Sequence, residues 1–180
     1  AIYANTDISG NGGLGIDLIG INGVNANDAG DADTGANSLM NFPVVTSIVG
    51  TTVKFVLDTT ANANGYRIDF YRNPGGLDPT GFGEGQVWLS SCVVAAPSAS
   101  VPSSCTVAGL DAASLSMTAT RCQNASCATT ATTSIGSTSE FSGPSSTDLR
   151  ISKTDGQTQY GTGQTLTYTI VVSNAGTTTV

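Results

Sequence analysis

The chain of 180 residues contains no histidine. Histidine is the usual general base beside a nucleophilic serine or cysteine, so its absence excludes Ser-His-Asp and Cys-His catalytic centres. It also removes the commonest nitrogen ligand of zinc. Two carboxylates would suffice for a glycosidase, but no spacing in the sequence pairs any two of them. We therefore expect a protein that is not an enzyme.

Basic residues are scarce as well. Six lysines and arginines stand against thirteen aspartates and glutamates, which gives a formal net charge of −7. Proteins that bind nucleic acid need clustered positive charge to neutralise phosphates, so we expect no nucleic-acid partner. No apolar run reaches the length of a transmembrane helix, so we also expect no membrane span.

Charged residues make up only 11% of the chain, whereas threonine, serine, glycine, alanine and asparagine dominate. Threonine favours strands, and glycine, asparagine and serine favour turns. Apart from alanine, good helix formers are few. The composition therefore predicts an all-β protein with almost no helix.

The four cysteines are Cys92, Cys105, Cys122 and Cys127. They lack the CxxC pairs of a metal site, and an even number indicates two disulfides formed in an oxidising compartment. This favours an extracellular or cell-surface location. Because each would close a short, hairpin-sized loop, we prefer the bridges Cys92–Cys105 and Cys122–Cys127, each stapling an edge hairpin. The two other connectivities stay open.

An acidic stretch rich in asparagine and glycine lies between Leu14 and Pro43. Carboxylates held close together repel one another unless a cation neutralises them, and oxygen ligands on a glycine-spaced backbone suit Ca²⁺. The sequence therefore predicts a calcium site, with a solvated acidic linker as the alternative. The candidate ligands are Asp17, Asn25, Asp28, Asp31, Asp33 and Asn37.

This stretch is not an EF-hand. The spacing Asp31-x-Asp33 begins like an EF-hand loop, but Gly35 occupies the third ligand position. Phe42 stands where the EF-hand requires a bidentate glutamate. The ligands of any calcium ion must therefore be collected irregularly, with help from asparagine and backbone oxygens.

Apolar and polar residues alternate between Pro43 and Ser142, which is typical of half-buried strands. Roughly seven short strands with turns such as Asn64-Gly65 predict an immunoglobulin-like β-sandwich over residues 43–143. The expected strands include 52–58, 66–71, 86–96, 104–107, 113–120 and 138–141.

Residues 1–42 place short apolar segments among Asn/Gly turns, as in one rung of a parallel β-helix. The motifs NxGLGIDL at 11–18, GDADTGxN at 30–37 and NFP at 41–43 resemble the C-terminal region of bacterial secreted right-handed parallel β-helix repeat surface proteins. The resemblance continues through YRIDFYRNP at 66–74, GFGEGQ at 81–86 and TSEFS at 138–142. It implies a β-helix end rung with an acidic loop over 1–42, followed by the sandwich.

Residues 144–180 contain a linker and a partial β module. DLRISKT at 148–154 and LTYTIVVSN at 166–174 resemble the start of a widespread bacterial surface repeat. One strand face carries Leu166, Tyr168, Ile170 and Val172. This strand either belongs to a piece of a longer surface protein or completes a neighbouring subunit by β-strand addition, which would propagate as a filament. The open edge of the N-terminal rung is the expected acceptor.

These features predict an extracellular structural subunit or stalk module whose partners are copies of itself or neighbouring modules. The alternative is a carbohydrate-binding or host-surface-binding adhesin, with a glycan stacked on Tyr66, Tyr71, Phe82 and Trp88. Two further carboxylates in a glycine-rich loop would add a second cation or sugar contact, or else are solvated charges. They are Asp78 and Glu84.

Overall fold

The computed structural model describes residues 2, 4–20, 23–95, 101–125, 127, 134–143, 149–159 and 161–174. This part of the chain contains nine strands and two short 3₁₀ helices, η1 (Ala36–Leu39) and η2 (Ala112–Ser114), without any α-helix. The all-β prediction is confirmed. No helix in the described ranges has both the length and the apolar character needed to span a membrane.

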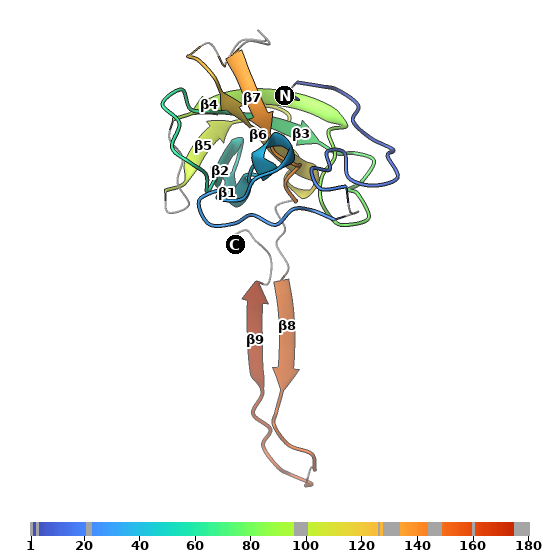
Figure 1. The fold of residues 1–180 in the computed structure, drawn as a ribbon. Coiled ribbons are helices and arrows are strands. Elements are labelled where there is room, and N and C mark those ends of the chain that lie inside the picture. Colours follow the sequence, from blue (N-terminus) through green and yellow to red (C-terminus); the bar gives the residue numbers. More distant parts are fainter. Residues whose placement is uncertain are drawn as a thin grey trace.

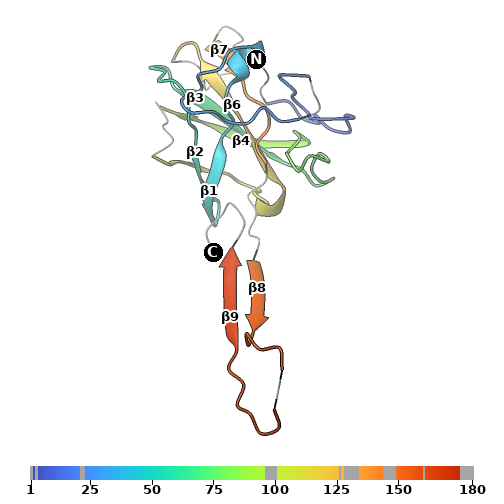
Figure 2. The same ribbon diagram turned by 60° about the horizontal axis from the view of Figure 1, so that its bottom comes forward.

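Seven of the strands form two antiparallel sheets (Figures 1 and 2). The three-stranded sheet has the order β1-β2-β5 and consists of β1 (Val44–Val49), β2 (Thr52–Val56) and β5 (Ser103–Thr106). The four-stranded sheet has the order β4-β3-β6-β7 and consists of β3 (Tyr66–Arg72), β4 (Val87–Val94), β6 (Leu115–Cys122) and β7 (Ile135–Thr138).

The main apolar core lies between these two sheets. Phe55 of β2 and Phe70 of β3 meet edge to face, with their ring centroids 6.2 Å apart. Ile68 and Met117 pack in the same cluster, and all four side chains are fully buried. Alternate residues of β2, β3 and β6 therefore point inward, as the period of two predicts.

The final strand of the sandwich was predicted at 138–141, but the structure places it at Ile135–Thr138. The ladder of β7 ends at Thr138, after a register shift opposite β6. Beyond it, the N–H of Ser139 still donates to Ala119 O and that of Ser142 to Met117 O. The chain thus stays beside β6, but without regular pairing.

The other face of the four-stranded sheet is covered by the N-terminal segment, residues 4–18 (blue in Figures 1 and 2). Ile16 of this segment packs with Tyr71 and Phe141 in a second apolar cluster. One antiparallel bridge, Ile8 to Gly85, ties the segment to the loop before β4. The described residues within 1–42 form no strand, so the expected β-helix rung is not seen among them.

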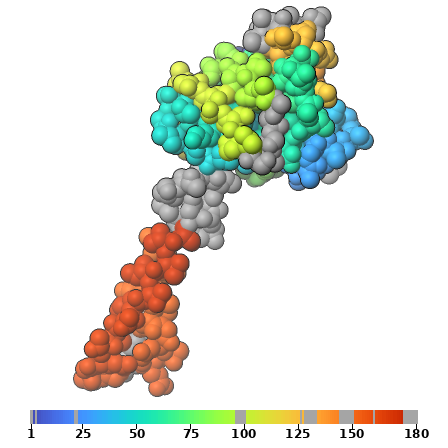
Figure 3. Space-filling model, turned by 90° about the vertical axis from the view of Figure 1, so that its left-hand side faces the viewer, coloured from blue at the N-terminus to red at the C-terminus, as the bar shows by residue number. Residues whose placement is uncertain are grey.

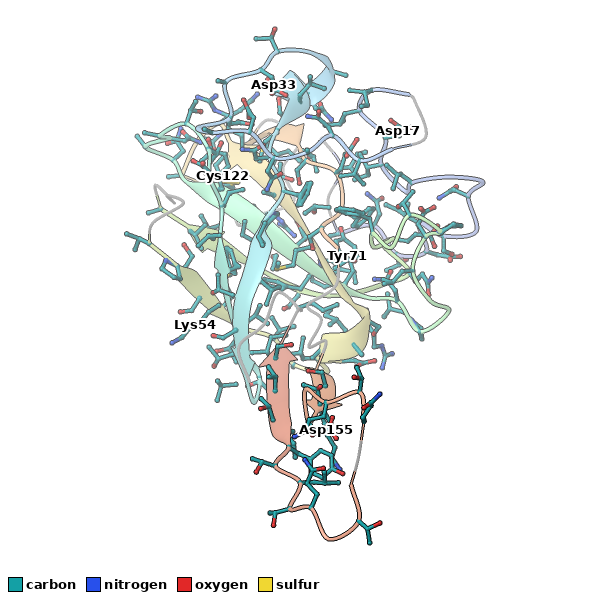
Figure 4. The ribbon with its side chains drawn as sticks, turned by 90° about the horizontal axis from the view of Figure 1, so that it is seen from below. Asp17, Asp33, Lys54, Tyr71, Cys122 and Asp155 are labelled. Carbon is teal, nitrogen blue, oxygen red and sulfur yellow. A yellow bond between two sulfur atoms is a disulfide. The ribbon has the colours of Figure 1, made fainter. Side chains whose placement is uncertain are left out.

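Both predicted disulfides are present, Cys92–Cys105 and Cys122–Cys127. The prediction that the first staples a hairpin is wrong, because β4 and β5 belong to different sheets. The chain between them crosses from one sheet to the other, so Cys92–Cys105 joins the sheets at their edges. Cys122–Cys127 closes a short loop after β6 (Cys122 is labelled in Figure 4).

The remaining strands, β8 (Leu149–Thr154) and β9 (Thr169–Asn174), pair only with each other as an antiparallel hairpin (Figures 1 and 3). Most of the linker expected before them lies outside the described residues.

A charged pair is buried on the covered face of β3. Arg67 donates from Nε and Nη2 to the two carboxylate oxygens of Asp69, at 2.8 Å each. The indole N–H of Trp88 donates to Asp69 Oδ1 at 2.7 Å. Arg67 and Asp69 are only 2% and 0% exposed. This bidentate geometry satisfies both charges where water cannot reach them.

Asp69→Asn should lower the free energy of unfolding by about 3–5 kcal/mol, because it leaves the Arg67 charge buried without its counter-ion. Urea unfolding of the oxidised protein measures the loss. Asp111→Asn is the matched control. Asp111 is exposed and caps η2, a role that asparagine keeps, so the variant should stay within about 0.5 kcal/mol of the parent. Equal effects of the two substitutions would show that the pair contributes little.

Candidate cation site in the acidic loop

The structure brings three of the six predicted ligands together. One oxygen from each of Asp28, Asp31 and Asp33 lies within 4.8 Å of the other two. Oxygens that bind one Ca²⁺ at about 2.3–2.6 Å are at most about 5 Å apart. The three half-buried carboxylates therefore have a spacing that could hold a metal ion.

A tight turn makes this convergence possible. Gly30 and Asp31 both have left-handed backbone angles, with φ of 72° and 58°. Glycine adopts this region freely, and aspartate more readily than most residues. The turn lets Asp28 Oδ2 accept a hydrogen bond from the N–H of Ala32 at 3.0 Å. Asp28 and Asp31 consequently face the same space.

Asn41, which is 2% exposed, fixes this turn to the sandwich. Its Oδ1 accepts from the N–H of Asp28 at 3.0 Å, and its Nδ2 donates to the carbonyls of Asp28 and Asp58 at 2.7 and 2.6 Å. Its own N–H donates to Asp31 Oδ1 at 2.8 Å. In the sequence, Asn41 is marked only as the first residue of the NFP motif, and this role was not predicted.

Asp31 also connects the acidic loop with the loop between β2 and β3. Its Oδ2 accepts a hydrogen bond from Thr59 Oγ1 at 2.9 Å. Each oxygen of Asp31 thus has one donor and keeps a lone pair for a cation.

Two oxygens of the cluster are buried without a hydrogen-bond partner, Asp28 Oδ1 and Asp33 Oδ1. Burying an unpaired carboxylate oxygen is costly, and native structures rarely leave one so. A cation among the three carboxylates would satisfy both atoms. This is a stronger indication of a site than negative charge alone.

The other three predicted ligands have different surroundings. Asn25 Nδ2 donates to Asp33 Oδ2 at 3.3 Å and to Leu39 O at 3.2 Å, so its amide acts here as a donor. Asp17 and Asp33 lie in different loops (Figure 4). The Oδ1 atom of Asp17 accepts hydrogen bonds from the backbone N–H groups of Ile19 and Gly20. Asn37 lies in η1 with φ of 49°.

Glu140, 1% exposed, anchors the start of the loop. Its Oε1 accepts from the N–H of Leu18 at 2.9 Å and its Oε2 from the N–H of Asn25 at 2.8 Å. Burial raises the pKa of Glu140 above its ordinary value, and the two hydrogen bonds oppose that shift. In the sequence, the only signal of this anchor is its place in the TSEFS motif.

The aromatic platform predicted for a glycan is not present. Tyr66 and Tyr71 are 1% and 0% exposed and belong to different buried clusters on β3. Phe82 packs edge to face on Phe42, with centroids 5.5 Å apart. The four predicted rings therefore cannot form one exposed stacking surface.

Comparison of the chain with models of protein families, with curated proteins and with solved structures finds no match. The resemblances seen in the sequence therefore stay expectations.

Glu140→Gln should destabilise the protein by about 1–3 kcal/mol, because the new amide group points an N–H donor at a backbone N–H. Hydrogen exchange at the amides of Leu18 and Asn25 should accelerate, which global unfolding data alone would not reveal. Asp7→Asn, at an exposed carboxylate of the N-terminal segment, is the control. Unchanged protection of the two amides would show that Glu140 does not anchor the loop.

Proposed function

We propose that the chain is a non-catalytic structural module of an extracellular bacterial surface protein. A Ca²⁺ ion fixes its acidic loop, and its β8–β9 hairpin joins it to a neighbouring copy by β-strand addition. The observation that carries this proposal is the uncovered apolar face of the hairpin.

That face follows from the register of β8 and β9. Ile151 pairs with Val172, and Ile170 with Lys153, so these side chains share one side of the hairpin. Ile151, Ile170 and Val172 are 73%, 61% and 61% exposed. Lys153 Nζ lies 3.9 Å from the centre of the Tyr168 ring. An isolated two-stranded hairpin is marginally stable, and exposed apolar strands tend to pair with other chains.

Strand β1 offers an acceptor edge. It is the outer strand of the three-stranded sheet, so one of its edges has no strand neighbour among the described residues. A hollow of about 140 Å³ beside its start is lined by Phe42, Val44 and Phe82. A donated strand would hydrogen-bond to β1 and place alternate side chains in this hollow. This edge replaces the N-terminal rung as the proposed acceptor.

The β8–β9 hairpin and the β1 edge are two different surfaces of the same chain. Because the two surfaces differ, the contact is heterologous and extends into a filament.

Calcium is proposed from the chemistry of the donors. The cluster offers carboxylate oxygens only, which suit hard cations rather than zinc or copper. Ca²⁺ accepts irregular arrangements of six to eight oxygens, whereas Mg²⁺ requires a nearly ideal octahedron. An irregular loop held by Asn41 and Thr59 therefore fits Ca²⁺ better. The bound ion would join the loop to the sandwich.

Calcium should raise the thermal stability, since a ligand of the folded state alone adds about 2.7 kcal/mol at one hundred times its Kd. Differential scanning calorimetry with Ca²⁺, with Mg²⁺ and with chelator measures the shift. Asp31→Asn should abolish the part of the Ca²⁺-dependent rise in melting temperature that comes from the acidic loop. Asp17→Asn is the matched control and should retain this rise. A melting curve that excess chelator leaves unchanged rejects the loop site.

Removing residues 148–180 should convert a self-associating chain into a soluble monomer. Light scattering after size-exclusion chromatography, together with electron microscopy, distinguishes the two states. Two double variants separate the faces of the hairpin: Ile170→Lys with Val172→Lys on the apolar face, and Ser152→Lys with Thr169→Lys on the polar face. Only the first pair should block assembly. A full chain that stays monomeric at high concentration contradicts strand donation, as does a truncated chain that still polymerises.

A further inference from the structure

The loop between β3 and β4 carries two carboxylates that are removed from solvent. Asp78 is 5% exposed and Glu84 is 6% exposed. The alternative that these are solvated charges is therefore wrong. Nothing in the proposed function uses either residue, and both lie on a different loop from Asp28, Asp31 and Asp33.

Asp78 and Glu84 line one hollow of about 400 Å³, between the loop 75–86 and residues 9–11 of the N-terminal segment. Asn11 and Gln86 contribute further polar groups to its wall. Asp78 also borders an adjoining hollow of about 240 Å³. The space is therefore walled by two separate stretches of chain.

The hydrogen bonds leave part of this charge unsatisfied. Asp78 Oδ1 accepts from the N–H of Thr80 at 2.7 Å, but Asp78 Oδ2 is buried and has no partner. Glu84 Oε2 accepts a weak bond of 3.3 Å from Gln86 Nε2. The same Nε2 donates to Gly76 O at 2.9 Å, and Gln86 Oε1 accepts from the N–H of Gly75 at 2.7 Å. Gln86 thus braces the loop.

The walls supply no positive charge. Neither lysine nor arginine lines either hollow. Two buried carboxylates without a counter-ion are energetically unfavourable, and an unpaired oxygen adds to that cost. An anion would be repelled, and a neutral sugar would leave both charges uncompensated. A cation is the occupant that resolves the imbalance.

We propose that this hollow is a second site for a hard divalent cation of the Ca²⁺ type, bound by the carboxylates of Asp78 and Glu84. Its donors are oxygens, and its size leaves room for water to complete the coordination. Residues 9–11 and parts of the loop 75–86 both border the hollow, so an ion bound there would hold the N-terminal segment on its sheet. Backbone bonds already join these stretches, from Asp7 N to Gln86 O and from Ile8 N to Gly85 O.

Isothermal titration of chelator-treated protein with CaCl₂ tests the site. The double variant Asp78→Asn with Glu84→Gln should bind one ion fewer than the parent, or bind it at least tenfold more weakly. Asp31→Asn, which disables only the acidic loop, should keep the ion of this hollow. Asp111→Asn, which removes one charge at an exposed carboxylate, should bind as the parent does.

The four titrations separate the two proposals. If the double variant binds as many ions as Asp111→Asn, with the same affinities, the hollow is not a cation site. If Asp31→Asn binds Ca²⁺ like the parent while the double variant loses an ion, the cation site in the hollow is supported and the acidic-loop site is rejected. Backbone NMR provides a second readout, because Ca²⁺ should shift the amide resonances of Thr80 and Gly81 in the parent. No such shift on saturation would also overturn the proposal.

Discussion

Strand β3 is buried on both faces, and the rest of the sandwich depends on this constraint. One face sends Ile68 and Phe70 into the apolar core, and the opposite face carries Arg67 and Asp69. A buried ion pair is tolerable only when its geometry satisfies both charges, as the bidentate contact and the Trp88 indole do here. The N-terminal segment must therefore stay docked, because its removal would expose an apolar cluster around Tyr71.

Side chains replace strand pairing where the chain is irregular. A segment without strands still has to satisfy its backbone polar groups. Glu140 accepts the N–H groups of Leu18 and Asn25, and Asn41 bonds both polar groups of the Asp28 backbone. These two buried residues thereby fix a long loop at its start and near its end. The three carboxylates converge because their backbone is held in this way.

The periodicity of the sequence predicted which residues are buried more accurately than it predicted which residues they pack against. The alternation in β2, β3 and β6 correctly identified the core face, and loop lengths correctly paired the cysteines. The crossing between β4 and β5 was missed because a short connection reads as a hairpin. Ile8 and Ile16 looked like part of a β-helix rung, yet in the structure they pack against Tyr71 and Phe141. Asn41 and Glu140 were missed because a buried polar anchor leaves no periodic signal.

The two halves of the fold are stabilised by different chemistry. The sheets are held by an apolar core and a disulfide between their edges, neither of which needs an ion. The described residues within 1–42 are held by buried polar anchors and a small apolar cluster, against the mutual repulsion of three converging carboxylates. The disulfide therefore strengthens the sandwich. The described loops of residues 1–42 depend instead on the side chains that satisfy their backbone and on how the charge of three converging carboxylates is balanced.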